Sequence, residues 1–377
     1  MNVHIYPSPL THESRILRIT DALVEAGVFQ TIEVIGVAHS GLAQRESVDA
    51  HRTLVRLPRR LFAKGESFIA KLCRTLEWSA RVLIYLRRQK ISCINAHSLA
   101  VLPLCALGCA LTGALLVYDT HELETETTGY KGLRQKLGRL IEKLLIHRSA
   151  MVCVVSDSIA DWYAHTYDIQ RPTVVRNIPQ YQAPVGYDRS AMRASLGLHS
   201  ERVVFIYQGG FIRGRGVERL LRVFARLPGV DLVCMGSGPL QSSVQQAADD
   251  YPNIHLVPPV APHEVLAYSQ AADIGICLTE NSCLSHYYSL PNKIFEYLHA
   301  GLPIIVNSLF EQERLINEFD CGWVAAEDDA AFARLLSGID HTAIMALRPG
   351  VQAALQGLQW SEEKACLIEA YKEHGFV

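Results

Sequence analysis

A lysine and a glutamate lie close together near the start of a predicted helix in the stretch 289–305, SLPNKIFEYLHAGLPII. Pro291 is a residue that helices accept in their first turn, and Gly301 is one that commonly ends them. Lys293 follows the helix start, where free N–H groups and the helix dipole favour anions, and Glu296 lies one turn further on. This combination suits a nucleotide sugar, which carries a diphosphate beside ribose hydroxyls. An ordinary helix with one exposed lysine and one exposed glutamate would give the same pattern.

A second candidate phosphate site follows the predicted strand 203–207, where the sequence continues QGGFIRGRGVERLLRVFARL. Between this strand and the next helix lie four glycines, Gly209, Gly210, Gly214 and Gly216. Glycines let the backbone approach a phosphate closely, and an arginine can bind two of its oxygens. Arg213 and Arg215 lie in this loop, just before the helix. The pattern is neither a P-loop nor a dinucleotide fingerprint, which disfavours a dehydrogenase.

A histidine and several acidic residues follow another predicted strand, in the sequence VYDTHELETE at 117–126. They are Asp119, His121, Glu122, Glu124 and Glu126. Such a group can bind a metal ion, act in acid–base catalysis, or orient sugar hydroxyls. A metal site is the least favoured of the three, because no second histidine follows at the spacing of helical ligands.

The loop 7–15 follows the first predicted strand and contains Thr11, His12, Glu13, Ser14 and Arg15. Ligands of parallel sheets bind beyond the carboxyl ends of the strands, which is where this loop lies. Many enzymes that use nucleotide sugars have glycines here, and this loop has none. It can shape a pocket for an acceptor, or it can be a plain connection.

Strand and helix patterns alternate through both halves of the chain, beginning with a strand at 3–6, a helix at 15–26 and a strand at 32–37. Such repeats predict an α/β fold with parallel sheets and right-handed crossovers. The pattern starts afresh at 203, after a segment at 183–187 that resembles a linker. We therefore predict an N-terminal Rossmann-like domain at 1–180 and a second one at 181–358. A final helix at 359–377 can pack back onto the first domain.

The net charge of −2 conceals an uneven distribution. Residues 1–180 contain 22 Lys and Arg against 16 Asp and Glu, and the remainder contains 14 against 22. The two halves thus carry about +6 and −8, which indicates different partners. The ten cysteines are scattered without zinc-type spacing, and the start MNVHIYPS lacks the pattern of a secretory signal. Both features favour a reducing cytoplasm.

Two segments bear on membranes. The stretch 99–118 has no charged residue, but it contains Pro103, Gly108 and Gly113 and runs into LLVYD. A buried helix followed by a parallel strand explains it better than a membrane span. The stretch 52–90 has 11 Lys and Arg against two acidic residues, with apolar side chains interleaved. It suits the surface of an anionic membrane, or else a solvated basic face over a buried apolar one. No RNA or DNA motif accompanies the charge, so nucleic acid is not an expected partner.

Several motifs together resemble one family. They are the loop YQGGFIRGRGVERLLRVF, the strand and loop VCMGSGPL, the strand ADIGICL, the segment NKIFEYLHAGLPII and the closing WSEE. As a set they are similar to those of retaining GT-B glycosyltransferases of the family-4 type, which build bacterial surface polysaccharides and glycolipids. The resemblance covers nearly the whole chain and implies two Rossmann-like domains that face each other across a cleft.

The resemblance also implies roles for individual residues. Arg215 would clamp the donor diphosphate with help from Arg213, and Glu296 would bind the ribose hydroxyls. His121 would lie near the reacting sugar. The backbone at Gly209 and Gly210 would contact the donor, and the segment at Pro259 and Val260 would read the base. Asn177 would lie at the crossing between domains. On the acceptor side we place His12, Arg15 and Glu122.

Two positions depart from the family pattern. A first glutamate is expected eight residues before Glu296, and Tyr288 stands there instead. Backbone groups of Tyr288, Ser289 and Leu290 can contact the donor in its place. The usual arginine after the first glycine of the phosphate loop is replaced by Gly210, so the cationic role falls to Arg213, Arg215 and Lys293.

The expected function is transfer of a sugar from a nucleotide diphosphate sugar to an acceptor hydroxyl with retention at the anomeric carbon. We expect His121, Arg215 and Lys293 to act in the reaction, no metal and no cofactor, and a glycan or lipid-linked acceptor. Polysaccharide or lipopolysaccharide synthesis on the inner face of the membrane fits a cytoplasmic, peripheral enzyme. Two alternatives stay open, a nucleotide-sugar epimerase of the same fold and a non-catalytic nucleotide-sugar-binding subunit of an assembly complex.

Overall fold

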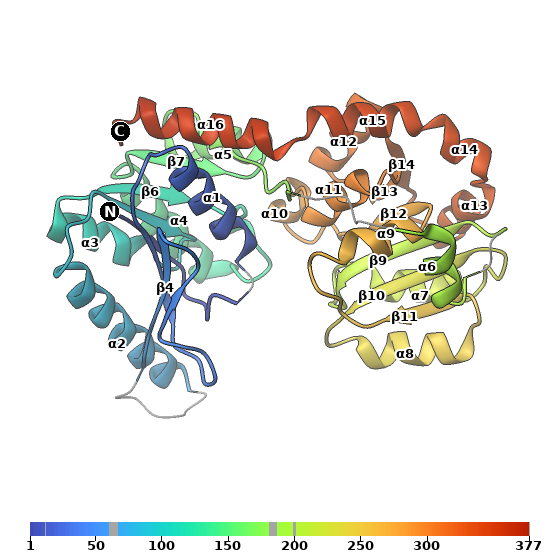
Figure 1. The fold of residues 1–377 in the computed structure, drawn as a ribbon, viewed down its shortest axis with the longest axis horizontal. Helices are drawn as coiled ribbons and strands as arrows, with labels where there is room; N and C mark the ends of the chain where they lie inside the picture. Colours follow the sequence, from blue (N-terminus) through green and yellow to red (C-terminus); the bar gives the residue numbers. More distant parts are fainter. Residues whose placement is uncertain (12, 60–66, 181–186, 199–200, 377) are drawn as a thin grey trace. The chain divides into compact units, whose positions relative to one another are not determined.

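The computed structural model describes residues 1–377 except 12, 60–66, 181–186, 199–200 and 377 (Figure 1). The chain forms two compact units. Unit 1 comprises Met1–Arg176 together with Ser361–Val377, and unit 2 comprises Asn177–Trp360. These boundaries differ by a few residues from those that the sequence suggested.

Unit 1 is built on an eight-stranded sheet in the order β3-β4-β2-β1-β5-β6-β7-β8. The strands are β1 (Asn2–Ile5), β2 (Ile32–Val37), β3 (Arg45–Ser47), β4 (Arg52–Leu57), β5 (Cys93–His97), β6 (Leu115–Asp119), β7 (Met151–Val154) and β8 (Thr173–Val174). All neighbouring pairs in this sheet are parallel except β3 with β4. The central strands β1 and β5 are buried along their whole length, as expected for parallel strands covered by helices on both faces.

The helices of unit 1 follow the predicted alternation. They are α1 (Ser14–Glu25), α2 (Phe68–Leu86), α3 (Leu102–Thr112), the short 3₁₀ helix η1 (Glu124–Glu126), α4 (Gly132–Ile146), α5 (Asp157–Tyr167) and α16 (Trp360–Glu373), whose first residue belongs to unit 2. Within the basic stretch 52–90 the described residues form β4 and α2, and residues 60–66 lie outside the description. Helix α3 contacts both α2 and α4.

The uncharged segment 99–118 forms α3 and β6, separated by Gly113 in the left-handed conformation. The helix is only 11 residues long. Among the described residues, no helix combines the length and apolar character that crossing a bilayer requires. The interpretation as a helix followed by a parallel strand therefore agrees with the structure, although α3 is buried on one face only and exposes Leu107 and Leu111 on the other.

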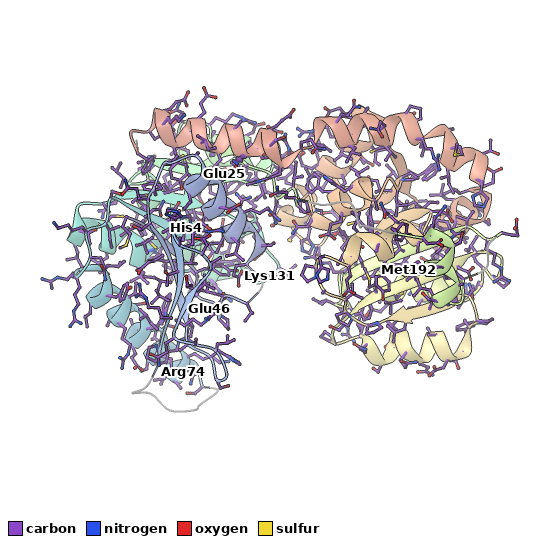
Figure 2. All side chains as sticks on the ribbon, viewed as in Figure 1. His4, Glu25, Glu46, Arg74, Lys131 and Met192 are labelled. Atoms are coloured by element: carbon purple, nitrogen blue, oxygen red, sulfur yellow. The ribbon has the colours of Figure 1, made fainter. Side chains whose placement is uncertain are left out.

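The C-terminal helix α16 belongs to unit 1 and meets the end of α1 (Figure 1). Tyr371 is buried and donates a hydrogen bond of 2.5 Å to Oδ1 of Asn95 on β5. Its ring also meets Phe29 edge to face. Lys364 of α16 pairs with Glu25, which Figure 2 labels at the end of α1. On the same helix Cys366 is the one exposed cysteine of the ten.

Unit 2 is built on a six-stranded parallel sheet in the order β11-β10-β9-β12-β13-β14. Its strands are β9 (Val204–Gly210), β10 (Asp231–Ser237), β11 (Ile254–Val257), β12 (Ile274–Cys277), β13 (Ile304–Asn307) and β14 (Gly322–Ala325). Its helices are α6 (Arg189–Ser195), α7 (Val217–Phe224), α8 (Gln241–Asp250), α9 (Val265–Ala271), α10 (Leu284–Tyr287), α11 (Asn292–His299), α12 (Phe310–Phe319), α13 (Asp329–Gly338), α14 (His341–Ala346) and α15 (Arg348–Gly357).

Helix α11 is locked onto the sheet of unit 2 by Tyr297. Its hydroxyl donates to the carbonyl of Ile276 on β12 and accepts from the N–H of Gln208 on β9. The ring occupies the space above Gly275, where an added Cβ would lie 2.1 Å from the ring. This close approach brings the side chains of α11 to the carboxyl end of β9, where the glycine-rich loop begins.

Candidate functional site

The phosphate loop predicted from the sequence lies at the carboxyl end of β9 in unit 2. Gly209 has a φ of +116°, which glycine adopts without strain, and Gly236 of β10 lies against the carbonyl of Gly209 so closely that a Cβ there would be 2.0 Å from it. Gly216, with a φ of +78°, precedes α7. Two glycine-bearing strand ends and a helix start therefore meet at one edge of the sheet, with room for a ligand to approach the backbone.

Lys293 lies under this loop. Its Nζ is 4.0 Å from the centre of the Tyr207 ring, and an added Cβ at Gly209 would be 3.5 Å from the same Nζ. Burial lowers the pKa of Lys293, and the positive charge of Arg215 lowers it further. A cation held near a second cation, with an aromatic face for support, is arranged to receive an anion.

The two arginines of the loop differ in their surroundings. Nη1 of Arg215 lies 3.5 Å from Oγ1 of Thr279, just beyond β12, and its charge acts on Lys293 and His286. The Arg213 side chain is 88% exposed and lies 3.5 Å from Glu218. Arg215 thus belongs to the same cluster as Lys293, whereas Arg213 extends into solvent. Gly210 accepts a hydrogen bond from the Tyr207 hydroxyl through its carbonyl.

Glu296 of α11 takes part in a short chain of hydrogen bonds. The amide nitrogen of Gln208 donates to Glu296, and the Ser269 hydroxyl of α9 donates to the Gln208 amide oxygen at 2.7 Å. A cavity of about 420 Å³ adjoins these groups. Its lining includes Gln208, Gly209, Gly236, Pro259, Val260, Lys293 and Glu296. The cavity thus combines backbone from two strand ends, a cation and a hydroxyl-accepting carboxylate.

Residues 288–290, which precede α11, contribute less directly to this cavity. Ser289 donates from its hydroxyl to the carbonyl of His286, and its own carbonyl accepts from Gln312. The ring of Tyr288 packs edge to face on Phe310, and Leu290 packs on the apolar core. The side chain of Tyr288 is thus used in packing. Asn177 donates to Asn292 at 2.7 Å within the same unit.

In unit 1 the predicted His121 belongs to a cluster at the carboxyl ends of β5 and β6. Nδ1 of His97 lies 3.0 Å from Oδ2 of Asp119, and Nε2 of His121 lies 3.6 Å from the same oxygen. Nδ1 of His4 on β1, which Figure 2 labels, lies 2.8 Å from Nε2 of His97. Nδ1 of His97 and Nε2 of His121 are also 3.0 Å from each other, so at most one of these two nitrogens carries the proton that Asp119 accepts.

Arg15 holds the carboxylate of this cluster. Its Nη2 and Nε lie 2.6 Å and 3.1 Å from the two oxygens of Asp119, and its Nη1 donates to the carbonyl of Val175. Burial would raise the pKa of Asp119, but Arg15 and the two histidines hold it well below its usual value. Burial lowers the pKa of His97 to about 4, although Asp119 opposes this shift.

The cluster has implications for the predicted acceptor side and for metal binding. Arg15 is 6% exposed, and its guanidinium is fully engaged with Asp119 and Val175. Its position therefore does not favour direct contact with an acceptor. His97, Asp119 and His121 place ligand-type atoms within 4.8 Å of one another, a geometry compatible with a metal ion. The bidentate contact with Arg15 already balances the charge of Asp119. His12 lies outside the described residues.

The acidic residues after β6 have separate environments. Glu122 is exposed. Glu124 is buried, and burial raises its pKa to about 8 even though backbone N–H groups of Leu99 and His121 oppose the shift. Glu126 accepts from Gln135 and pairs with Arg139 of α4. The five polar residues of this segment therefore do not form a single site.

Several residues of these clusters were not predicted as site residues from the sequence. They are His4, His97, Gln208, Ser269 and Thr279. His97 ends the motif CINAH and could have been noticed as a histidine at a strand tip. Gln208 and Ser269 lie 61 positions apart and meet only because β9 and α9 pack together. No local pattern marks such a pair.

Comparison with protein-family models gives two matches. A model described as "Glycosyltransferase Family 4" matches residues 12–178, and one described as "Glycosyl transferases group 1" matches residues 202–339. Together the two matches span most of the chain. No curated protein matches the sequence.

Many solved structures share the fold. Sucrose-phosphate synthase from Thermosynechococcus elongatus superposes with a TM-score of 0.80 at 14% identity, covering 99% of this chain and 98% of that one. HepE of Anabaena, solved with UDP and glucose, gives 0.75 at 14% identity, covering 99% of each chain. WaaG, a glycosyltransferase involved in lipopolysaccharide biosynthesis, gives 0.68 at 14% identity over the full length of both.

Two α/β units with largely parallel sheets, one of which carries a glycine-rich loop with a lysine and a carboxylate beside it, match the fold of GT-B glycosyltransferases. The family matches narrow this class. The chain belongs to glycosyltransferase family 4 of group 1, whose members use nucleotide sugars and retain the anomeric configuration. The predictions of family, fold class and enzyme class are thereby confirmed.

Proposed function

We propose that this glycosyltransferase binds the nucleotide diphosphate of its donor in the cavity of unit 2. The supporting observation is the arrangement around that cavity, which combines Lys293, Glu296 and two glycine-bearing strand ends. The diphosphate would lie at Gly209, Lys293 and Arg215. The ribose hydroxyls would donate to Glu296, and the base would lie against Pro259 and Val260.

The chemistry asked of these residues is stabilisation of a leaving group. Negative charge builds on the diphosphate as the glycosidic bond breaks, so cations fixed beforehand stabilise the transition state more than the ground state. Lys293 is partly buried and its Nζ lies over the Tyr207 ring, which limits its reorganisation during the reaction. We propose that Lys293 and Arg215 supply this charge without a metal ion. Arg213 would have a lesser part because of its exposure.

We further propose that His121 contacts the reacting sugar and that Glu122 lies on the acceptor side. Support for His121 comes from the network that fixes its ring, since Asp119 is itself held by Arg15. UDP-glucose is the first donor to test, because HepE was solved with it. A glycan or a lipid-linked acceptor of cell-surface polysaccharide synthesis is the class of acceptor that we propose.

The donor assignment is tested by a thermal-shift screen with UDP, GDP, ADP and CMP and their sugar conjugates, with and without EDTA. A ligand that binds only the native state raises the melting temperature. We expect a shift with one nucleotide family that EDTA does not remove. Absence of any shift would contradict nucleotide binding and favour a structural role, whereas a shift without release of nucleotide from a sugar donor would favour the non-catalytic subunit. Turnover of the donor without any acceptor would favour an epimerase.

The roles of the two arginines are separated by a matched pair of variants. Arg215→Ala removes a cation from the cluster with Lys293, and hydrogen bonds to charged groups contribute about 1.5–3 kcal/mol. We expect a loss of roughly 10- to 100-fold in nucleotide diphosphate affinity, measured by calorimetry. Arg213→Ala serves as the control and should change the affinity by less than a factor of about three. Equal losses in both variants would contradict the assignment.

A further inference from the structure

Helix α4 of unit 1 exposes the side chains that a helix of a water-soluble protein normally buries. The exposed fractions are 82% for Leu133, 54% for Leu137, 54% for Leu140 and 63% for Leu144. Their spacing of four, three and four residues places these leucines along one face of the helix. A continuous leucine stripe in water is unfavourable unless something covers it.

The opposite face of α4 is polar at its centre. Glu142 is fully buried and accepts hydrogen bonds of 2.6–2.7 Å from the hydroxyls of Tyr118, Tyr163 and Tyr167. The buried face of α4 thus carries a carboxylate between Gly138 and Ile146, while four leucines lie on the exposed face. Because the three tyrosines fix Glu142, the helix cannot rotate to bury its leucines without leaving a buried carboxylate unpaired.

The apolar surface continues onto the neighbouring helices. Helix α3, which contacts both α2 and α4, exposes 49% of Leu107 and 47% of Leu111. Helix α2 exposes 60% of Leu76 and 54% of Ile84. We call the leucine stripe of α4, together with the exposed aliphatic residues of α3, the α4 face.

Basic residues flank this stripe. The exposed charged residues of α4 are Arg134, Lys136, Arg139 and Lys143, while its single acidic residue, Glu142, is buried. Apolar side chains bordered by cations suit the surface of an anionic bilayer, where the leucines reach the acyl chains and the cations meet lipid headgroups.

We propose that the α4 face docks unit 1 onto an anionic lipid bilayer. The sequence alone favoured the stretch 52–90 for this role. The structure moves the centre of the surface to α4, and α2 of that stretch would contribute at its side. The helix lies close in sequence to the segment with His121, and its Arg139 pairs with Glu126 of that segment. Docking would therefore orient the His121 end of unit 1 with respect to the membrane.

A second copy of the chain fits the α4 face less well. Two copies could pair through Leu133, Leu137, Leu140 and Leu144, which have the spacing of a coiled-coil seam. The flanking positions would then bring Arg134, Lys136 and Lys143 of each copy together. Like charges at these positions oppose pairing.

The experiment is vesicle flotation of the full chain. Vesicles of phosphatidylcholine alone are compared with vesicles that also contain phosphatidylglycerol, at low and high salt. We expect binding to the anionic vesicles only, weakened by salt. Failure of the protein to bind anionic vesicles would overturn the proposal.

Variants locate the surface. The double substitution Leu137→Gln with Leu140→Gln should weaken vesicle binding at least tenfold. The control double substitution, Leu17→Gln with Met345→Gln, alters exposed apolar residues elsewhere and should leave binding unchanged. Likewise Lys136→Glu with Lys143→Glu should abolish the preference for anionic vesicles, whereas Lys372→Glu with Arg226→Glu, which changes the net charge equally, should preserve it.

Two results would assign the α4 face to something else. Equal binding by the leucine variant and its control would place the lipid contact outside the α4 face. A wild-type dimer in sedimentation experiments that dissociates in the leucine variant, without vesicle binding, would show pairing of two copies. Thermal unfolding of each variant confirms that it is folded, and nucleotide-induced shifts in unit 2 report on donor binding separately.

Discussion

The orientation of Glu296 on helix α11 depends on a side chain of strand β9. Gln208 donates to Glu296 and accepts from Ser269, so its amide can point only one way. In the donor site that we propose, a carboxylate fixed in this manner would keep its remaining lone pairs for ribose hydroxyls without a search over rotamers. We therefore regard Gln208 as a positioning residue for donor binding.

This role gives a prediction with its own readout. Gln208→Leu should weaken binding of the preferred nucleotide about fivefold, because one hydrogen bond contributes about 1 kcal/mol. The preference for that nucleotide over its 2′-deoxy analogue should shrink as well, since Glu296 is no longer aligned with the diol. Calorimetry with both ligands measures each effect. A preference that stays intact while affinity falls would indicate a packing role only.

A second prediction at the residue scale concerns the buried Glu124, whose pKa is raised to about 8. Between the ordinary carboxyl pKa and this value the folded chain keeps the proton and the unfolded chain releases it, so stability falls as pH rises. The slope is at most about 1.4 kcal/mol per pH unit for one proton. Urea titrations at several pH values should show a flatter profile in Glu124→Gln, while Glu369→Gln, at an exposed site of the same unit, keeps the wild-type slope. A profile unchanged in Glu124→Gln would show that this group does not titrate there.

At the scale of elements, the loop between β9 and α7 depends on Gly216. An added Cβ there would lie 2.4 Å from the Cβ of Leu278 and 2.7 Å from its carbonyl oxygen, and the φ of +78° is unfavourable for other residues. Gly214 has a similar φ of +81°, but no atom lies within 4 Å of its added Cβ. A side chain at either position would therefore strain the backbone, but only one at Gly216 would also clash with Leu278.

Substitution of these glycines therefore separates the two effects. Gly214→Ala should lower the free energy of unfolding by about 1–2 kcal/mol, the usual cost of a left-handed residue. Gly216→Ala should cost more, because the end of β12 with Thr279 must shift as well. Urea unfolding of both variants gives the comparison. Equal destabilisation would mean that the loop moves freely around Leu278.

Sequence patterns were sufficient to predict most of the helices and strands, because buried parallel strands and amphipathic helices have recognisable hydrophobic patterns. The exposed three-residue β3 and the four-residue α10 lack such a signal. The candidate site was only partly predictable. Lys293, Arg215 and Glu296 lie in local motifs, whereas His97, Asp119 and Arg15 come together from strands and a helix far apart in the chain. Arg15 was placed on the acceptor side because an arginine in a loop gives no sign of a buried carboxylate partner.

At the scale of the whole molecule, the chain returns to unit 1 through α16. Glu363 accepts from the backbone N–H of Arg176 and pairs with its side chain, and Tyr371 fills a buried position against Asn95 and Phe29. The last residues of the sequence thus complete the unit that the first residues begin.

We predict that Tyr371→Ala destabilises unit 1 by about 3–5 kcal/mol, as loss of a large buried aromatic side chain does. Hydrogen exchange followed by mass spectrometry should show faster exchange in β1 and β5, with exchange in unit 2 unchanged. Lys372→Ala, at an exposed neighbouring position, is the control. Equal acceleration in both units would contradict the assignment of α16 to unit 1.

The exposed thiol of Cys366 makes α16 accessible to covalent labelling. The other nine cysteines are buried or partly covered, so a thiol-directed fluorophore should react first at this helix. Its sulfur lies 3.7 Å from the carbonyl of Val174 on β8, so detachment of the helix would change the surroundings of the dye. The wild-type chain, labelled at this one cysteine, would then suffice to record in real time how often its C-terminal helix detaches.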